Sequence, residues 1–190
     1  MEPFFIEFDG NYLHGDIISD DISLPPELLC LHGDTAEGRS GFLLLRQLLL
    51  KKHAISSCAF DFSGFGGSTN MPAHSGLHWQ TQVTQATDII DACFDSQPLS
   101  IVASDCSAQA ALHLATTFPV RQVVLLNPPP NWEGIGNFSW QSVAMPVAGA
   151  KTLSYLNSEP ALLLKIAKLI KDTLLGDGHL IRHSYKEYSF

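Results

Sequence analysis

The stretch IVASDCSAQAAL, residues 101–112, runs from an apolar, strand-like segment directly into an alanine-rich, helix-like one. Small residues bracket a cysteine where the two meet, in the order Ser104-Asp105-Cys106-Ser107-Ala108. A strand that turns at once into a helix is a building unit of α/β sheets. The start of a helix favours an anion, and the thiolate is the reactive form of cysteine. This corner therefore predicts an α/β fold and a candidate nucleophile, Cys106.

Segments on both sides of the corner continue the same alternation. The stretch from Phe4 to Ser19 predicts a hairpin that turns at Asp9-Gly10-Asn11. Further strands are expected at residues 28–31, 54–62, 100–103, 120–127 and 151–156. Helices are expected at residues 41–50, 78–94, 106–118 and 160–170. Residues 128–150, with their prolines and glycines, are expected to be an irregular surface segment.

This alternation predicts one α/β domain over residues 1–190, with a mostly parallel central sheet and helices on both faces. The formal charge of −8 and the pI near 5.3 argue against a nucleic-acid partner. We also expect no signal peptide and no membrane-spanning segment, because the apolar stretches are short and interrupted by charges.

The cysteines and glycines limit the kinds of site to expect. The four cysteines, which lack paired or zinc-binding spacing, are Cys30, Cys58, Cys93 and Cys106. We therefore expect reduced thiols, a cytoplasmic location, no metal and no cofactor. The glycines of the stretch SGFGGS lack the lysine of a phosphate-binding loop, so they predict a tight turn.

Four stretches, in this order along the chain, resemble motifs of the α/β-hydrolase superfamily. They are Leu31-His32-Gly33, the segment DFSGFGGS at residues 61–68, the corner at residues 104–108, and Leu175-Gly176-Asp177-Gly178-His179. The cysteine at the corner resembles that of dienelactone hydrolases. The resemblance covers nearly the whole chain and implies a minimal α/β-hydrolase fold without a lid domain.

The residue types at the corner suit a sharp turn that carries a nucleophile. Ser104 and Ala108 are small enough not to collide with the neighbouring strand or helix, and a nucleophile at such a turn has a strained backbone. The carboxylate of Asp105 works against Cys106, because a nearby negative charge raises the pKa of a thiol. Ser107 is a rival nucleophile, but a glutamine would then stand where a small side chain is needed.

The resemblance also implies partners for the nucleophile. His179, near the end of the chain and flanked by glycine, is the expected base, and Glu159 is the expected acid that orients it. Glu133 and Asp177 remain alternatives for the acid.

An oxyanion formed during the reaction needs hydrogen-bond donors. We expect them to be the backbone N–H of Ser107 and that of Asp34 or Thr35, in the loop after His32. His32 itself is expected to fix this loop by hydrogen bonding.

The predicted function is hydrolysis of an ester, thioester or lactone through an S-acyl intermediate at Cys106. The partner is a small acyl substrate, and a homodimer remains a possible arrangement. An acyltransferase would use the same residues, with a bound alcohol or thiol in place of water. A catalytically inactive binding protein with the same fold is the third alternative.

Overall fold

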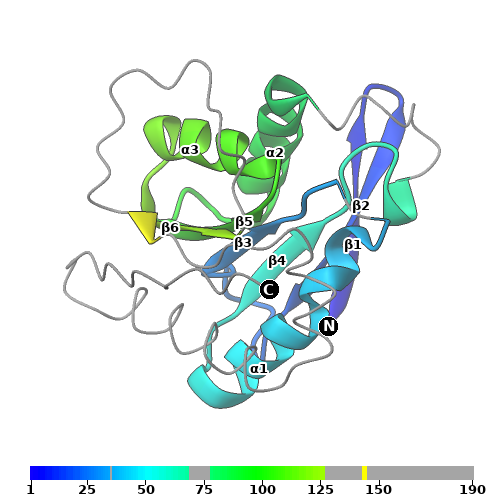
Figure 1. Ribbon diagram of the computed structural model, residues 1–190. Helices are drawn as coiled ribbons and strands as arrows, with labels where there is room; N and C mark the ends of the chain where they lie inside the picture. Colours follow the sequence, from blue (N-terminus) through cyan, green and yellow to red (C-terminus); the bar gives the residue numbers. More distant parts are fainter. Residues whose placement is uncertain (35, 69–77, 127–142, 145–190) are drawn as a thin grey trace, which may run out of the picture.

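The computed structural model describes residues 1–34, 36–68, 78–126 and 143–144 of the chain. Within these residues one sheet has the strand order β1-β2-β4-β3-β5-β6-β7 (Figure 1). Its strands are β1 (Glu2–Phe8), β2 (Asn11–Ile18), β3 (Leu28–Leu31), β4 (Ser57–Phe60), β5 (Leu99–Ser104), β6 (Val120–Leu126) and β7 (Val143–Ala144). β2 is antiparallel to both β1 and β4, whereas every pair from β4 to β7 is parallel. The predicted, mostly parallel sheet is confirmed.

The predicted hairpin forms one end of this sheet. Asp9 and Gly10, between β1 and β2, have φ values of 49° and 72°. Two consecutive positive φ angles are what a two-residue type I′ turn requires, and aspartate and glycine tolerate them best. The register runs from Glu2 opposite Ile17 to Phe8 opposite Asn11.

Helices cover both faces of the sheet, as predicted (Figure 1). The helical segments are η1 (Gly38–Phe42), α1 (Leu43–His53), η2 (Gly66–Ser68), α2 (Trp79–Cys93) and α3 (Ser107–Thr117). α1 and η1 pack on one face, and α2 and α3 pack on the other.

Strand β3 shows how the sheet separates the two cores. Leu28 and Cys30 belong to the core beneath α1, whereas Leu29 and Leu31 belong to the core beneath α2 and α3. All four side chains are fully buried. Successive side chains of a strand point to opposite faces, so a strand covered on both faces is a continuous apolar run.

The described part of the chain differs from the prediction at β7. Val143 and Ala144 pair in parallel with β6, although we expected residues 128–150 to be irregular. A strand of two residues is too short to give an alternating pattern that a sequence analysis could detect. The strand expected at 151–156 and the helix expected at 160–170 lie outside the described residues.

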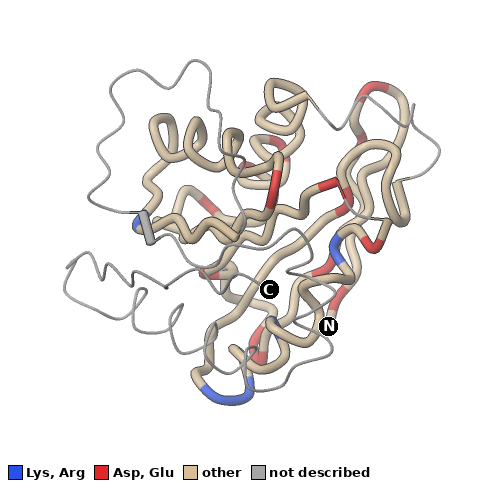
Figure 2. Tube along the Cα trace, in the orientation of Figure 1, with Lys and Arg blue, Asp and Glu red and all other residues tan. Residues whose placement is uncertain are grey.

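Charged residues are distributed unevenly over the described residues. Acidic residues occur at more places along the tube than basic residues, which occur at only a few (Figure 2). Among the helices described here, none combines the length and apolar character needed to cross a membrane.

Candidate active site

The turn between β5 and α3 has its left-handed residue one position earlier than we expected. Asp105 has a φ of 49°, whereas Cys106, the N-cap of α3, has φ −63° and ψ −21°. Aspartate enters the left-handed region more readily than most residues because its short polar side chain can bond locally. The strained position of the corner is therefore that of Asp105, and Cys106 already has helical angles.

Hydrogen bonds fix this turn to the strands on either side of β5. The Ser107 hydroxyl is within hydrogen-bond distance of two carbonyl oxygens, that of Leu31 at 2.9 Å and that of Ser104 at 2.8 Å. The N–H of Asp105 donates to the carbonyl oxygen of Leu126 in β6 at 2.9 Å. Because Ser107 is fully buried, its hydroxyl has a structural role and is not accessible as a nucleophile.

The loop after β3 lies directly against Asp105. The N–H of Gly33 donates to the Ser104 hydroxyl at 2.8 Å. A Cβ atom at Gly33 would lie 2.6 Å from both the Cβ and the Oδ2 of Asp105. Such distances are far below van der Waals contact, so only glycine allows the Asp105 carboxyl group to lie here. The His32-Gly33 motif and the corner thus form one site at the carboxyl ends of β3 and β5.

His32 fixes this loop, as predicted. Its Nε2 accepts the N–H of Phe62 at 2.9 Å, so its proton is on Nδ1, which donates to the carbonyl oxygen of Gly33 at 2.7 Å. The ring is fully buried, and burial lowers the pKa of His32 below its ordinary value. A neutral, doubly hydrogen-bonded imidazole is a structural group that joins the loops after β3 and β4.

Cys106 is half-buried beside this turn. Its Sγ accepts a hydrogen bond from Gln82 Nε2 at 3.7 Å, and the backbone N–H of Asp34 also bonds to it. Burial is the largest influence and raises the pKa of the Cys106 thiol, and the carboxylates of Asp34 and Asp105 raise it further. These effects outweigh the two hydrogen bonds, so the thiol keeps its proton near neutral pH.

Comparison with known proteins gives a match in structure only. No protein-family model and no curated protein matches the chain. The thioesterase domain from the curacin biosynthetic pathway has 24% sequence identity and a TM-score of 0.59, over 73% of this chain and 48% of that domain. A laboratory-evolved potato epoxide hydrolase has 21% identity and a TM-score of 0.55, over 66% of this chain and 39% of the hydrolase. An α/β-hydrolase fold protein from Burkholderia ambifaria has 14% identity and a TM-score of 0.52, over 84% of this chain and 51% of its own.

The chain has the α/β-hydrolase fold. It spans about half or less of the length of these structures, between 39% and 51%. The sheet order and the corner after β5 together place the candidate site at the carboxyl ends of the parallel strands, where open α/β sheets bind ligands.

Several predicted site residues of this α/β-hydrolase fold cannot be placed. The oxyanion-loop residue Thr35, the base His179 and the acid Glu159 lie outside the described residues, as do the alternative acids Glu133 and Asp177. The described residues bring together Asp34, Asp105, Cys106 and Ser107 where β5 ends and α3 begins.

Two features of the site were missed in the sequence. Asp105 was considered only as a neighbour of Cys106, although Ala103 and Ser107 give it the small flanking residues that such a turn needs. Gln82 in α2 is 1% exposed, and its Oε1 has no hydrogen-bond partner among the described residues. A glutamine inside an apolar helical pattern gives no signal that it is buried.

The glycine-rich segment of this fold is a tight turn, as predicted. It closes around the carboxylate of Asp61, which accepts the N–H of Gly67 at 2.8 Å. A Cβ atom at Gly66 would lie 2.4 Å from Asp61 Oδ2, so the close approach requires glycine.

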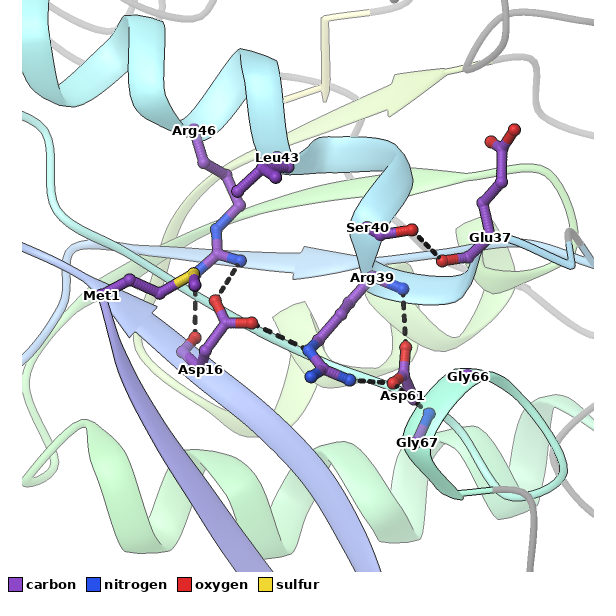
Figure 3. A pocket seen from close by; sticks show the side chains of 10 residues that line it. All are labelled: Met1, Asp16, Glu37, Arg39, Ser40, Leu43, Arg46, Asp61, Gly66 and Gly67. Carbon is purple, nitrogen blue, oxygen red and sulfur yellow. Dashed lines mark hydrogen bonds and ion pairs between the residues drawn. The ribbon is translucent and has the colours of Figure 1, made fainter.

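A pocket of about 320 Å³ lies beside this turn and contains charges that pair with one another (Figure 3). Arg46 is 1% exposed and donates to Asp16 Oδ1 at 2.6 Å, and Arg39 Nε donates to Asp16 Oδ2 at 2.8 Å. Arg39 also forms an ion pair with Asp61. These contacts join η1 and α1 to β2 and β4, so we assign the cluster to the structural framework. Within the described residues, no group of three His, Cys, Asp or Glu side chains is suited to hold a metal ion.

Proposed function

We propose that the chain is a hydrolase whose nucleophile is the carboxylate of Asp105. The observation that carries this proposal is the left-handed conformation of Asp105 on the turn, with its carboxyl group against Gly33. A residue strained in this way projects its side chain at the sheet edge, where a substrate can meet it. The similarity to an epoxide hydrolase and a thioesterase domain supports hydrolysis in general.

The chemistry of a carboxylate indicates the substrate class. Attack on an ester carbonyl would give an anhydride, which is more reactive than the ester itself. Attack on an electrophilic sp3 carbon gives an ester, which is a stable covalent intermediate. A strained epoxide fits this requirement, because its ring opening drives the step and its leaving oxygen stays attached to the product.

The reaction then has two balanced steps. An oxygen of Asp105 forms a bond to an epoxide carbon, the carbon–oxygen bond of the ring breaks, and the released oxygen takes up a proton. Water then attacks the carbonyl carbon of the Asp105 ester, and the acyl carbon–oxygen bond breaks to release a diol and restore the carboxylate. His179 is the proposed base for the water, oriented by Glu159, with Glu133 and Asp177 as the alternatives.

Backbone amides are available for the oxyanion of the second step. The N–H of Asp34 reaches the sulfur of Cys106 and so lies at this corner. The N–H groups that open α3, at Cys106 and Ser107, have no partners within the helix because the first amides of any helix lack them. We assign the oxyanion to these donors, which together would stabilise it as backbone amides do in other acyl-transfer sites.

Cys106 as the nucleophile is the second candidate, and one observation favours it. Two donors, Gln82 Nε2 and the N–H of Asp34, approach its sulfur and would stabilise a thiolate. In that case the substrate is an ester, thioester or lactone, and the intermediate is an S-acyl enzyme. The raised pKa of Cys106 weighs against it, because a protonated thiol is a poor nucleophile.

Matched variants of the full chain distinguish the two nucleophiles. The substrates are an aryl epoxide, an aryl ester and an acyl thioester. We expect the wild type to hydrolyse the epoxide, and Asp105→Asn to lower kcat/KM on the order of 10⁴-fold or more. Cys106→Ser is the control and should retain activity within about 10-fold. After a single turnover in heavy-oxygen water, the label should be found in the Asp105 carboxylate.

Other outcomes would contradict the assignment of Asp105. Activity that survives in Asp105→Asn and disappears in Cys106→Ser would establish the thiol instead. Product formation only with an added alcohol or thiol acceptor would identify an acyltransferase. A wild-type chain that binds these probes without turnover or adduct would be a binding protein.

A further inference from the structure

One buried side chain at the candidate active site has a polar atom without a partner. Gln82, near the start of α2, is 1% exposed, and its Nε2 donates to the sulfur of Cys106 at 3.7 Å. Its Oε1 is buried and accepts no hydrogen bond from any described residue. Both atoms are attached to one carbon, so this carbonyl oxygen lies beside the corner that carries Asp105.

An unpaired carbonyl at this depth is exceptional. Buried polar atoms are nearly always hydrogen-bonded, and one that is not needs a physical reason. Gln85, three residues further along α2, shows the ordinary case, because its Oε1 accepts the Ser63 N–H at 3.1 Å. The other buried side-chain oxygen without a partner among the described residues is Oε1 of Gln122. That side chain is partly exposed and lies beside Ser100, at the opposite end of β5 from the site.

The surroundings of Gln82 determine what kind of group can complete it. Cys106, which Gln82 contacts, is only half-buried, so Gln82 lies directly behind accessible surface. A carbonyl oxygen only accepts hydrogen bonds, so its missing partner has to be a donor. Bringing a charge into a site this buried costs far more than bringing in a hydroxyl group, so we expect a neutral donor. A hydroxyl group of a ligand meets both conditions.

The position of this acceptor fits the reaction proposed for Asp105. Asp105 and Cys106 are consecutive, with Cα atoms about 3.8 Å apart, and Gln82 contacts the second of them. A small substrate whose electrophilic carbon lies at the Asp105 carboxylate can therefore place a neighbouring group against Gln82. A hydroxyl on the carbon next to an epoxide ring is such a group, and opening of the ring leaves it unchanged.

We propose that the Gln82 carbonyl oxygen selects epoxides that carry a hydroxyl group on the carbon next to the ring. This inference rests on the function proposed above. The hydroxyl donates to Oε1 while the reacting carbon lies at Asp105, and the bond from Nε2 to Cys106 holds the amide in this orientation. A substrate without the hydroxyl leaves the carbonyl unpaired, and sites with such unpaired groups discriminate strongly against it. Gln82 thus determines specificity and takes no part in the chemical steps.

Binding of two unreactive compounds to the full chain tests this recognition separately from the chemistry. They are phenylcyclopropanes, one with a hydroxymethyl group and one with an ethyl group of the same size. Both resemble an aryl epoxide, but a carboxylate does not open their rings. We expect calorimetry to give a dissociation constant about 10-fold lower for the hydroxymethyl compound, because it alone pairs with the carbonyl of Gln82.

Substitutions in α2 identify the acceptor. Gln82→Leu should bind the two compounds about equally, because it has no carbonyl, and Gln82→Met, which keeps the length of the side chain, should do the same. Gln80→Leu replaces an exposed glutamine of the same helix and should keep the wild-type preference. A merely structural role of Gln82 would weaken the binding of both compounds and leave their ratio unchanged.

Three results would overturn the proposal. They are equal or undetectable binding of the two compounds by the wild type, a preference that survives in Gln82→Leu, and tighter binding of an aminomethyl compound. The last result would assign recognition to a carboxylate such as that of Asp34.

Kinetics with the two matching epoxides separates this proposal from the proposed function. A wild type that prefers the hydroxymethyl cyclopropane but hydrolyses neither epoxide would keep the recognition by Gln82 and refute the epoxide reaction. A wild type that hydrolyses both epoxides with equal kcat/KM, unchanged in Gln82→Leu, would keep the reaction and refute the recognition. If both proposals are correct, the wild type should prefer the hydroxymethyl epoxide in kcat/KM, and Gln82→Leu should lose this preference while it still hydrolyses the ethyl epoxide.

Discussion

His32 shows at the scale of one residue how burial determines a protonation state. Both ring nitrogens are used, one as donor to Gly33 and one as acceptor from Phe62. A second proton would remove the acceptor and place a charge in a fully buried site. The pKa of His32 is lowered because burial makes its charged form unfavourable.

The pH dependence of folding stability follows from this lowered pKa. Above about pH 6.5, the ordinary histidine pKa, neither the folded nor the unfolded chain binds a proton at His32, and its full contribution to stability is present. Below that pH the unfolded chain takes up a proton that the folded chain does not. The free energy of unfolding should therefore fall as the pH decreases from about 6.5 towards the lowered pKa, by at most about 1.4 kcal/mol per pH unit.

Urea unfolding of the wild type and His32→Gln at several pH values measures this effect. The variant should be less stable at pH 8 by about 1–3 kcal/mol, because the Phe62 N–H loses its best acceptor. It should also lack the additional loss of stability between about pH 6.5 and 5. Equal slopes for the two proteins in that interval would show that His32 takes up its proton in the folded state.

At the scale of secondary-structure elements, α2 carries two buried glutamines on its apolar face. Gln85 is satisfied, because its Oε1 accepts the Ser63 N–H at 3.1 Å and its Nε2 contacts the Ser63 hydroxyl. Gln82 reaches Cys106 with Nε2, but its Oε1 is buried without a partner among the described residues. An unpaired buried carbonyl costs about 1–3 kcal/mol of folding stability. On the contacts of the described residues, burying Gln82 beside the candidate site therefore lowers the free energy of unfolding.

Leucine substitutions at these two glutamines should have opposite effects on stability. Gln82→Leu should keep or raise the free energy of unfolding, by up to about 1–3 kcal/mol, because it removes the unpaired carbonyl. Gln85→Leu should lower it by a similar amount, because the Ser63 N–H and hydroxyl lose their hydrogen bonds to Gln85. Gln82→Leu should also slow alkylation of Cys106 near pH 8, since the hydrogen bond from Gln82 lowers the pKa of that thiol. Equal destabilisation by both substitutions would contradict this account of α2.

Sequence periodicity predicted most of these elements, and its failures have physical reasons. The apolar run 28–31 and the helical face containing Ala86, Ile89 and Ile90 are buried as expected. The buried glutamines were missed because burial of a polar side chain depends on a partner elsewhere in the chain, here Ser63. The left-handed residue was expected one position late because Ala103, Ser104, Ser107 and Ala108 are all small, so size alone allows a turn centred on Asp105 or on Cys106.

At the scale of the whole molecule, parallel pairing decides which loops meet. β3 lies between β4 and β5, so the loops after these three strands share one edge of the sheet. Motifs separated by about 70 residues thereby become one site, as the hydrogen bond of 2.8 Å from the Gly33 N–H to Ser104 shows. The order of the motifs in the sequence was sufficient to predict that these loops lie together. Which residue of the turn is left-handed depends on the local backbone and was not predicted.

The base of the proposed reaction comes from a distant part of the chain, at His179. The two steps place different demands on this residue. Attack by the Asp105 carboxylate needs no base, whereas hydrolysis of the resulting ester needs a group that activates water. His179→Gln should therefore form the ester but release product about 10²–10⁴-fold more slowly.

An intact-mass measurement after mixing His179→Gln with an aryl epoxide tests this separation of the steps. The protein mass should increase by one substrate, and the added mass should map to Asp105. His183→Gln is the control, because it removes a neighbouring histidine and should turn over without accumulating an adduct. If His179→Gln instead kept the wild-type rate, the base would have to be another residue. If it lost activity without any adduct, the first attack would itself need His179. A protonated thiol needs such a base and a carboxylate does not, so this outcome would favour Cys106 over Asp105.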